Sequence, residues 1–538
     1  MSNKNFLKGA AILGLAGILV KILGAIYRIP LGNIIGDKGM GYYQTAYPLY
    51  NLMFAISTSG IPIAIAKLVS EKRALGDYRG AQRVFKISFI GLVIGGILTS
   101  SFVYFGAEFI VNQIGNSNAY YSMIALAPAL LFVPIMSAFR GYFQGRQNMT
   151  PTAFSQVMEQ LFRVIVGLTL TYQFLSMDKG LAVAAGGASF GASAGAILGT
   201  FAILFIYLKK RKSIKQELKK AAEYSQEKTR DIIKSILSIA IPITIGSSVV
   251  PLISTIDVAI VMRRLQDIGF SEAKASGLYG QLAGMAQTLI NFPQVFSIAL
   301  AMSLVPAISS AFATKDYADI RRTTRSGVRV TLLIGLPAAM GLFILSTPII
   351  KLLYFKNPLE VQQSAGEILG VLSFSVVFLT LVQSLTAILQ GLGKPFIPVR
   401  NLIIGALVKL VLTYTLTGIE EIGIKGAAIS TISAYVIAAT LNFIEVKKRT
   451  KTHFKLIDIF VKPIISVSIM TIVVWLVYNN INTIITPKLA TIVAIIMGAI
   501  SYGISLLVTG TITSRDFELL PAGDKISNIL RKFGLMRG

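Results

Sequence analysis

Long apolar segments, separated by short polar or charged stretches, recur along the whole of this 538-residue chain. Each segment holds roughly twenty mostly apolar residues, the length that an α-helix needs to cross the hydrocarbon core of a bilayer. With Gly, Pro and charge clusters as boundaries, we predict about fourteen spans, at residues 9–34, 42–66, 87–111, 121–143, 152–175, 181–208, 236–262, 278–311, 328–354, 364–391, 397–417, 424–446, 459–479 and 488–509. The pattern therefore predicts an all-α integral membrane protein.

The composition agrees with this class and excludes several kinds of chemistry. Hydrophobic residues make up 54% of the chain and charged residues only 14%, which is too apolar for a soluble protein of this length. The first segment is expected to be a retained span, because it is long, carries Lys21 near its middle and has no small-residue cleavage site after it. The chain has no Cys, so disulfides and thiolate catalysis are excluded, and we predict neither a cofactor nor a metal site.

The basic residues lie in every second loop. The formal net charge is +27, and residues 209–234 are crowded with Lys and Arg whereas residues 106–121 contain none. The positive-inside rule therefore predicts that both termini are cytoplasmic. Since the charge does not form one patch, we expect anionic lipid headgroups as neighbours and no nucleic acid.

Three short echoes indicate an internal duplication. They pair "GDYRGAQRVFKIS" (76–88) with "KDYADIRRTTRSG" (315–327), "FRGYFQG" (139–145) with "LTAILQG" (385–391), and "YLKKRK" (207–212) with "EVKKRT" (445–450). The offsets are 239, 246 and 238 residues, and each echo occupies the same place in its block of six spans. Spans one to six and seven to twelve are therefore predicted to be duplicated halves.

This duplication predicts the domain organisation. We expect an N-terminal lobe at 1–208, a basic cytoplasmic linker at 209–235, a second lobe at 236–446, and two extra spans with a cytoplasmic tail at 447–538. An even number of spans in each half makes the two lobes parallel repeats, a geometry that in some transporters places the substrate cavity between the halves.

The first span carries two cations on one helical face. Gly14, Gly17, Lys21, Gly24 and Arg28 are spaced by three or four residues, so they share that face. Lys21 lies about twelve residues, or roughly 18 Å, into the span, and a cation at that depth is normally turned toward a cavity or a partner. We therefore predict that Lys21 lines a cavity, whereas Arg28, nearer the outer surface, lines the cavity or reaches the membrane surface.

Other charges lie within predicted spans. Glu159 and Arg163 are four residues apart, so a structural salt bridge and a functional role for Arg163 both stay open. An offset of 246 residues takes Arg163 to Lys409 and Glu159 to Gly405, so Lys409 lacks this helical carboxylate. Asp257 is a candidate partner of a cavity cation or an ion site. Cavity cations favour an anionic substrate, and phosphate or diphosphate suits Lys and Arg.

Several stretches resemble one family. "FLKGAAILG" (6–14), "SGIPIAIAKLVSEKRALGD" (59–77) and "RGYFQGRQNMTPTAFSQVMEQLFR" (140–163) resemble the polysaccharide-biosynthesis branch of the multidrug/oligosaccharidyl-lipid/polysaccharide exporter superfamily. This branch includes the lipid II flippases and stage V sporulation B proteins of Gram-positive bacteria. The resemblance implies fourteen helices in two lobes and the flipping of undecaprenyl-diphosphate-linked sugars, with lipid II as the first candidate, across the bacterial cell membrane. It also implies that basic residues of the first span bind substrate, and that the lipid tail lies near spans thirteen and fourteen.

The family pattern and this chain differ at two spans. Members of the family carry charges in spans two and eight, but "YYQTAYPLYNLM" (42–53) and "GQLAGMAQTLINFPQ" (280–294) are uncharged, so the lipid-linked sugar stays open. A flippase for another lipid-linked unit and a cation or drug antiporter of the same superfamily are the alternatives. An enzyme would need positioned acid and base groups and usually long outer loops, which this sequence lacks.

We therefore expect a monomeric flippase that works by alternating access and that binds the diphosphate at Lys21, Arg28, Arg163 and Lys409. Membrane potential or an ion gradient would supply the energy. Deep cations and scarce membrane carboxylates favour membrane potential.

Overall fold

The computed structural model describes residues 3–219, 227–454 and 457–511. Part of the predicted linker (220–226) and the predicted tail (512–538) lie outside the described residues. The elements are α1 (Asn3–Thr58), α2 (Ile61–Ala74), α3 (Tyr78–Ile114), η1 (Ser117–Ala119), α4 (Tyr120–Gly145), α5 (Thr150–Ser176), α6 (Leu181–Lys219), α7 (Thr229–Asp267), α8 (Glu272–Tyr279), η2 (Gly280–Ala286), α9 (Gln287–Ala313), α10 (Tyr317–Ile344), α11 (Ser346–Leu353), α12 (Leu359–Ser373), α13 (Ser375–Gly391), α14 (Phe396–Thr417), α15 (Ile424–Thr450), η3 (Ile457–Val461), α16 (Lys462–Ile481) and α17 (Pro487–Val508).

The described residues form helices and no strand, which confirms the all-α membrane class. Within the residues that the structure describes, eleven helices are long and apolar enough to cross a membrane, or twelve if the bent pair α12 and α13 counts as one span. The number is below fourteen because one of these helices, Ile12–Ala74, runs through the first two predicted spans, and because α5 is not among the eleven. Inside α1, Gly36 has φ 65° and ψ −169°, so the helix is kinked between those two predicted spans.

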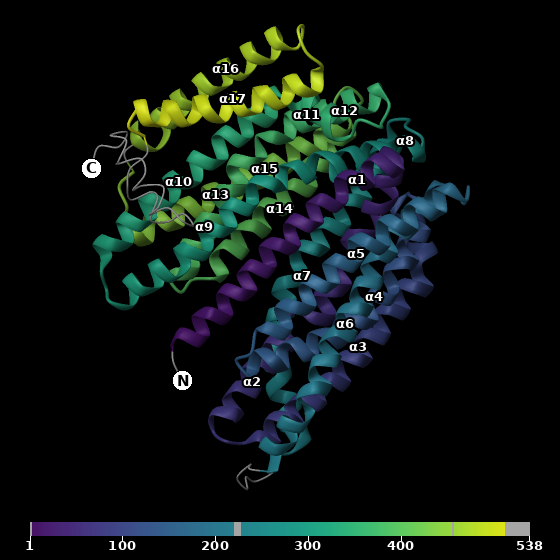
Figure 1. The fold of residues 1–538 in the computed structure, drawn as a ribbon, viewed down its shortest axis with the longest axis vertical. Coiled ribbons are helices and arrows are strands. Elements are labelled where there is room, and N and C mark those ends of the chain that lie inside the picture. Colours follow the sequence, from purple (N-terminus) through teal and green to yellow (C-terminus); the bar gives the residue numbers. More distant parts are fainter. Residues whose placement is uncertain (1–2, 220–226, 455–456, 512–538) are drawn as a thin grey trace. The chain divides into compact units, whose positions relative to one another are not determined.

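The chain divides into two compact units, Met1–Gly280 and Gln281–Gly538. In the first unit α4 and α5 both pack on α6, and α3 packs on α4 (Figure 1). In the second unit α14 packs on α15, α13 packs on α9 and α10, and α16 runs beside α17 (Figure 1).

The division between the compact units differs from the predicted lobe boundary at 209–235. Helix α7 packs on α1, α2 and α3, so it belongs to the first unit together with α8. The predicted lobes, 1–208 and 236–446, are thus not the two bodies defined by packing. As lobes of the protein, they stay a prediction.

The turns that precede α3 and α10 share one geometry. The Asp77 and Asp316 carboxylates each accept a hydrogen bond from the backbone N–H three residues later, at 2.7 and 2.9 Å. The residues before them, Gly76 and Lys315, have φ of 80° and 58°. The first sequence echo is therefore the same capped turn in both units.

The second echo is repeated in helix packing. A Cβ atom added to Gly145 would lie 2.8 Å from the Val69 Cβ, and one added to Gly391 would lie 2.7 Å from the Ile308 Cβ. Val69 and Ile308 are 239 positions apart, the offset of the first echo. Corresponding helices thus approach each other closely at a glycine in both units, which supports the predicted duplication.

Candidate functional site

The cationic face of α1 meets α5 at Gly24. A Cβ atom added to Gly24 would lie 3.5 Å from the Gln160 Nε2 atom of α5. Three residues further along α1, the buried Tyr27 hydroxyl donates a 2.9 Å hydrogen bond to the Ala188 carbonyl of α6. Lys21 and Arg28 therefore lie about one helical turn on either side of the point where α1 contacts α5.

These two cations differ from the other charges of the site. Lys21 is exposed and Arg28 is half-buried. Within the part of the chain that the structure describes, neither side chain has a hydrogen bond or an ion pair. Burying part of a cation without a counter-charge is unfavourable, and binding an anion offsets that cost.

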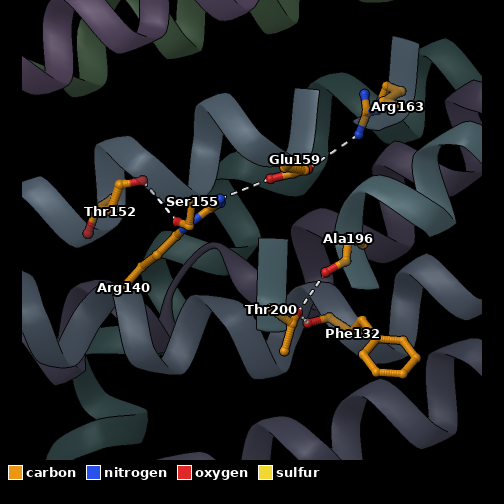
Figure 2. A network of polar contacts seen from close by, with 8 residues as sticks. All are labelled: Phe132, Arg140, Thr152, Ser155, Glu159, Arg163, Ala196 and Thr200. Carbon is orange, nitrogen blue, oxygen red and sulfur yellow. Dashed lines mark hydrogen bonds and ion pairs between the residues drawn. The ribbon is translucent and has the colours of Figure 1, made fainter. Parts of the chain in front are cut away.

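On α5, Glu159 is shared between two arginines (Figure 2). One carboxylate oxygen lies 3.0 Å from the Arg140 Nη2 atom and the other lies 3.3 Å from the Arg163 Nη2 atom. The Arg140 Nε atom also donates to the Ser155 hydroxyl at 2.9 Å, and Ser155 donates to the Thr152 carbonyl at 2.9 Å. Of the two interpretations of Arg163, the salt bridge to Glu159 is thus present, but it is shared with Arg140.

The Arg163 guanidinium is incompletely satisfied. Its Nε atom is buried and makes no hydrogen bond with any described residue. An unsatisfied buried donor costs about 1–3 kcal/mol. The tyrosines Tyr27, Tyr43, Tyr47 and Tyr50 of α1 lie near Arg163. Two arginines and one carboxylate leave one positive charge in this network.

Glycines of α6 allow the backbone of α5 to pack closely against α6. Cβ atoms added to Gly191 and Gly195 would lie only 2.5 Å from the Arg163 carbonyl oxygen and 2.3 Å from the Glu159 carbonyl oxygen. Any larger side chain at these positions would collide with the backbone of α5. The glycine-rich sequence of α6 thus positions the helix that carries Glu159 and Arg163.

The remaining predicted residues lie elsewhere. Lys409 is half-buried on α14, in the second unit, and Asp257 is half-buried on α7, in the first. Asp257 interacts electrostatically with the buried Tyr279 of α8. Among the described residues no group of three His, Cys, Asp or Glu side chains could hold a metal ion.

Sequence reasoning missed Arg140. It precedes Glu159 by 19 positions and lies on another helix, so no helical periodicity connects them. The only available signal was that an arginine and a glutamate occur in neighbouring predicted spans of low charge. Lys21, Arg28, Glu159 and Arg163 are identifiable from the sequence because each is a charged residue within a predicted span.

Comparisons with known proteins place the chain in a family. The family described as polysaccharide biosynthesis protein matches residues 6–312, and the MatE family matches residues 281–415. Stage V sporulation protein B of Bacillus subtilis is 30% identical over 83% of this chain and 85% of its own length. Lipid II flippase MurJ of the same organism is 29% identical over 85% of each chain.

Uncharacterized membrane protein YabM of Bacillus subtilis is 29% identical over 98% of this chain and 96% of its own length. Among solved structures, lipid II flippase MurJ in an inward closed conformation aligns with a TM-score of 0.69 at 18% identity, over 93% of this chain and 98% of that one. An inward-facing multidrug resistance MATE family transporter aligns with a TM-score of 0.67 at 14% identity, over 81% of this chain and 94% of that one. This chain is a multi-pass membrane protein of the polysaccharide biosynthesis protein family.

Proposed function

We propose that this protein is a flippase that moves undecaprenyl-diphosphate-linked sugars, with lipid II as the first candidate, from the inner to the outer leaflet of the bacterial cell membrane. The observation that carries the proposal is the group of cations around the contact between α1 and α5. Lys21 and Arg28 have no ion pair among the described residues, and Arg163 keeps an unsatisfied donor. A diphosphate matches such donors in charge and geometry.

Lys21, Arg28 and Arg163 would bind the diphosphate, and Lys409 of the second unit is proposed as a further substrate contact. Alternating access would then expose the bound headgroup first to the cytoplasm and then to the outside. The relatives named lipid II flippase and stage V sporulation protein B support this class of substrate. We also propose that both termini are cytoplasmic, on the basis of the basic loops.

The test is reconstitution into vesicles that contain a fluorescent polyprenyl-diphosphate disaccharide. The purified chain should make the inner-leaflet pool accessible to a membrane-impermeant quencher, and vesicles with a control membrane protein should not. Cleavage or transfer of the lipid, instead of unchanged movement, would contradict the proposal. Rescue of cells depleted of their lipid II flippase would identify lipid II among the possible substrates.

A cation or drug antiporter is the second candidate, because the MatE family matches residues 281–415. That activity would require a site for the coupling cation, and Asp257 on α7 is the first residue to examine. Drug efflux that depends on a sodium or proton gradient, is lost in Asp257→Asn, and occurs without lipid movement would favour this candidate.

We further propose that membrane potential drives the flippase. An inside-negative potential favours outward movement of a negative charge by about 2.3 kcal/mol per 100 mV, and it would pull an empty cationic site back toward the cytoplasm. Flipping in vesicles should persist without sodium and proton gradients and should stop when the potential is collapsed. Flipping that follows an ion gradient at zero potential would contradict voltage driving and would direct attention to Asp257.

A further inference from the structure

The positions of the two arginines around Glu159 are unequal (Figure 2). Arg140 is held at two atoms: its Nη2 atom lies 3.0 Å from Glu159, and its Nε atom donates to Ser155 at 2.9 Å. Arg163 is 3.3 Å from Glu159 through one Nη2 atom. The carboxylate therefore lies closer to the arginine of α4 than to the arginine on its own helix.

This inequality affects the donors of Arg163. A carboxylate that paired with Arg163 alone could accept two parallel hydrogen bonds from the guanidinium and neutralise it. Because one oxygen is bound to Arg140, Arg163 receives only the other, and its Nε atom is left buried without a partner among the described residues. The network as a whole keeps one positive charge, which favours binding of an anion.

The surroundings of Arg163 suit a phosphate group. Tyr43, Tyr47 and Tyr50 of α1 are among the phenols near Arg163, and phenols can donate hydrogen bonds to phosphate oxygens. Arg28 of α1 lies near Tyr27 and Tyr43, as Arg163 does. Two guanidinium groups thus lie around the same tyrosines, and guanidinium binds phosphate through paired donors.

We propose that Arg140 is a positioning residue for an anion site: by holding Glu159, it prevents the neutralisation of Arg163 and keeps that guanidinium available to a phosphate or diphosphate group. Arg140 itself does not contact the ligand. The identity of the ligand as a lipid-linked diphosphate rests on the proposed function, whereas the phosphate chemistry rests on these contacts.

The test measures binding of inorganic pyrophosphate to the full-length protein in detergent by isothermal titration calorimetry. Arg140→Gln should weaken binding at least about tenfold, since Glu159 would turn fully to Arg163. Glu159→Gln should strengthen binding about threefold or more, because it removes the competing carboxylate. Arg140→Lys should retain most of the affinity. Arg146→Gln is the matched control on the same stretch of chain, because Arg146 pairs with Glu217 instead of Glu159.

The double variant separates positioning from a structural role. If Arg140 acts only through Glu159, Arg140→Gln combined with Glu159→Gln should bind pyrophosphate within about threefold of Glu159→Gln alone. Equal weakening by Arg140→Gln in the presence and absence of Glu159 would overturn the proposal. If Arg140→Gln fails to fold, Glu159→Gln still gives an independent result. Unchanged or weaker pyrophosphate binding by Glu159→Gln would overturn the proposal. The absence of pyrophosphate binding by the unmodified protein would also overturn the proposal.

Flipping assays distinguish this inference from the proposed function. If pyrophosphate binding follows the expected pattern but no polyprenyl diphosphate is flipped, the proposed function fails and the anion site stands. If the lipid is flipped and Arg140→Gln neither weakens pyrophosphate binding nor slows flipping, the positioning role alone fails.

Discussion

Helices α5 and α14 hold corresponding positions in the two predicted repeats. Each packs closely on a neighbouring helix, but the glycine at the contact lies on different members of the two helix pairs. Arg163 and Lys409 are 246 positions apart, the offset that also relates Gly145 to Gly391. One turn before these cations α5 has Glu159, whereas α14 has Gly405. A Cβ atom at Gly405 would lie 2.4 Å from the Ala434 carbonyl oxygen of α15, so position 405 has no room for a carboxylate.

The difference lies in which helix supplies the glycine. In the first unit Gly195 of α6 makes the close approach, 2.3 Å from the Glu159 carbonyl oxygen for an added Cβ atom, so α5 is free to carry a side chain at 159. In the second unit α14 itself supplies the glycine. Packing therefore permits a carboxylate four residues before Arg163 and excludes one four residues before Lys409.

The largest expected effect comes from removing a cation in each unit. Lys21→Ala and Lys409→Ala should each reduce flipping in the vesicle assay about a hundredfold or more, or about 2.7 kcal/mol, while expression and insertion stay intact. Arg28→Ala should do less damage. Lys448→Ala, at an exposed position near the end of α15, is the control. Wild-type flipping by a well-inserted Lys21→Ala/Lys409→Ala double variant would remove both residues from the mechanism.

The packing contrast predicts a second, smaller effect. Gly195→Ala and Gly405→Ala should each lower the free energy of unfolding by about 1–3 kcal/mol, because the new Cβ atom meets backbone that cannot move aside. Thermal unfolding in detergent measures this loss. The controls are Gly91→Ala on α3 and Gly341→Ala on α10, where no atom of the described residues lies within 4 Å of an added Cβ atom. If Gly195→Ala and Gly405→Ala are as stable as the control variants, close helix packing does not require glycine at these positions.

The smallest effect compares the matched turns before α3 and α10. Asp77→Ala and Asp316→Ala should each destabilise the protein by about 1 kcal/mol through loss of the helix cap. Asp77→Ala should cost a few tenths of a kcal/mol more, because Asp77 also lies 3.4 Å from the Lys72 Nζ atom. Asp77→Asn and Asp316→Asn should keep the cap but remove the charge. The extra loss of stability in Asp77→Asn then measures the contribution of the ion pair with Lys72. Equal losses for both alanine variants would show that the ion pair contributes nothing measurable.

The sequence alone identified the features that depend on local chemistry. Apolar length predicted the membrane helices, the spacing of Lys21, Gly24 and Arg28 predicted one shared face, and short echoes predicted the repeats. The spacing of Glu159 and Arg163 predicted a possible salt bridge, but it left its presence open, because two residues four apart on a helix are near enough to pair and equally able to turn toward other partners.

Tertiary structure decided which distant residues meet. It paired Glu159 with Arg140, placed α7 against α1, α2 and α3, and joined the first two predicted spans through a kink at Gly36. Hydropathy and periodicity describe a helix and its faces, so they carry information about membrane insertion and about neighbours within a few residues. Contacts between helices depend on which glycines permit close approach and how each helix is rotated, and these are properties of the packed helices together.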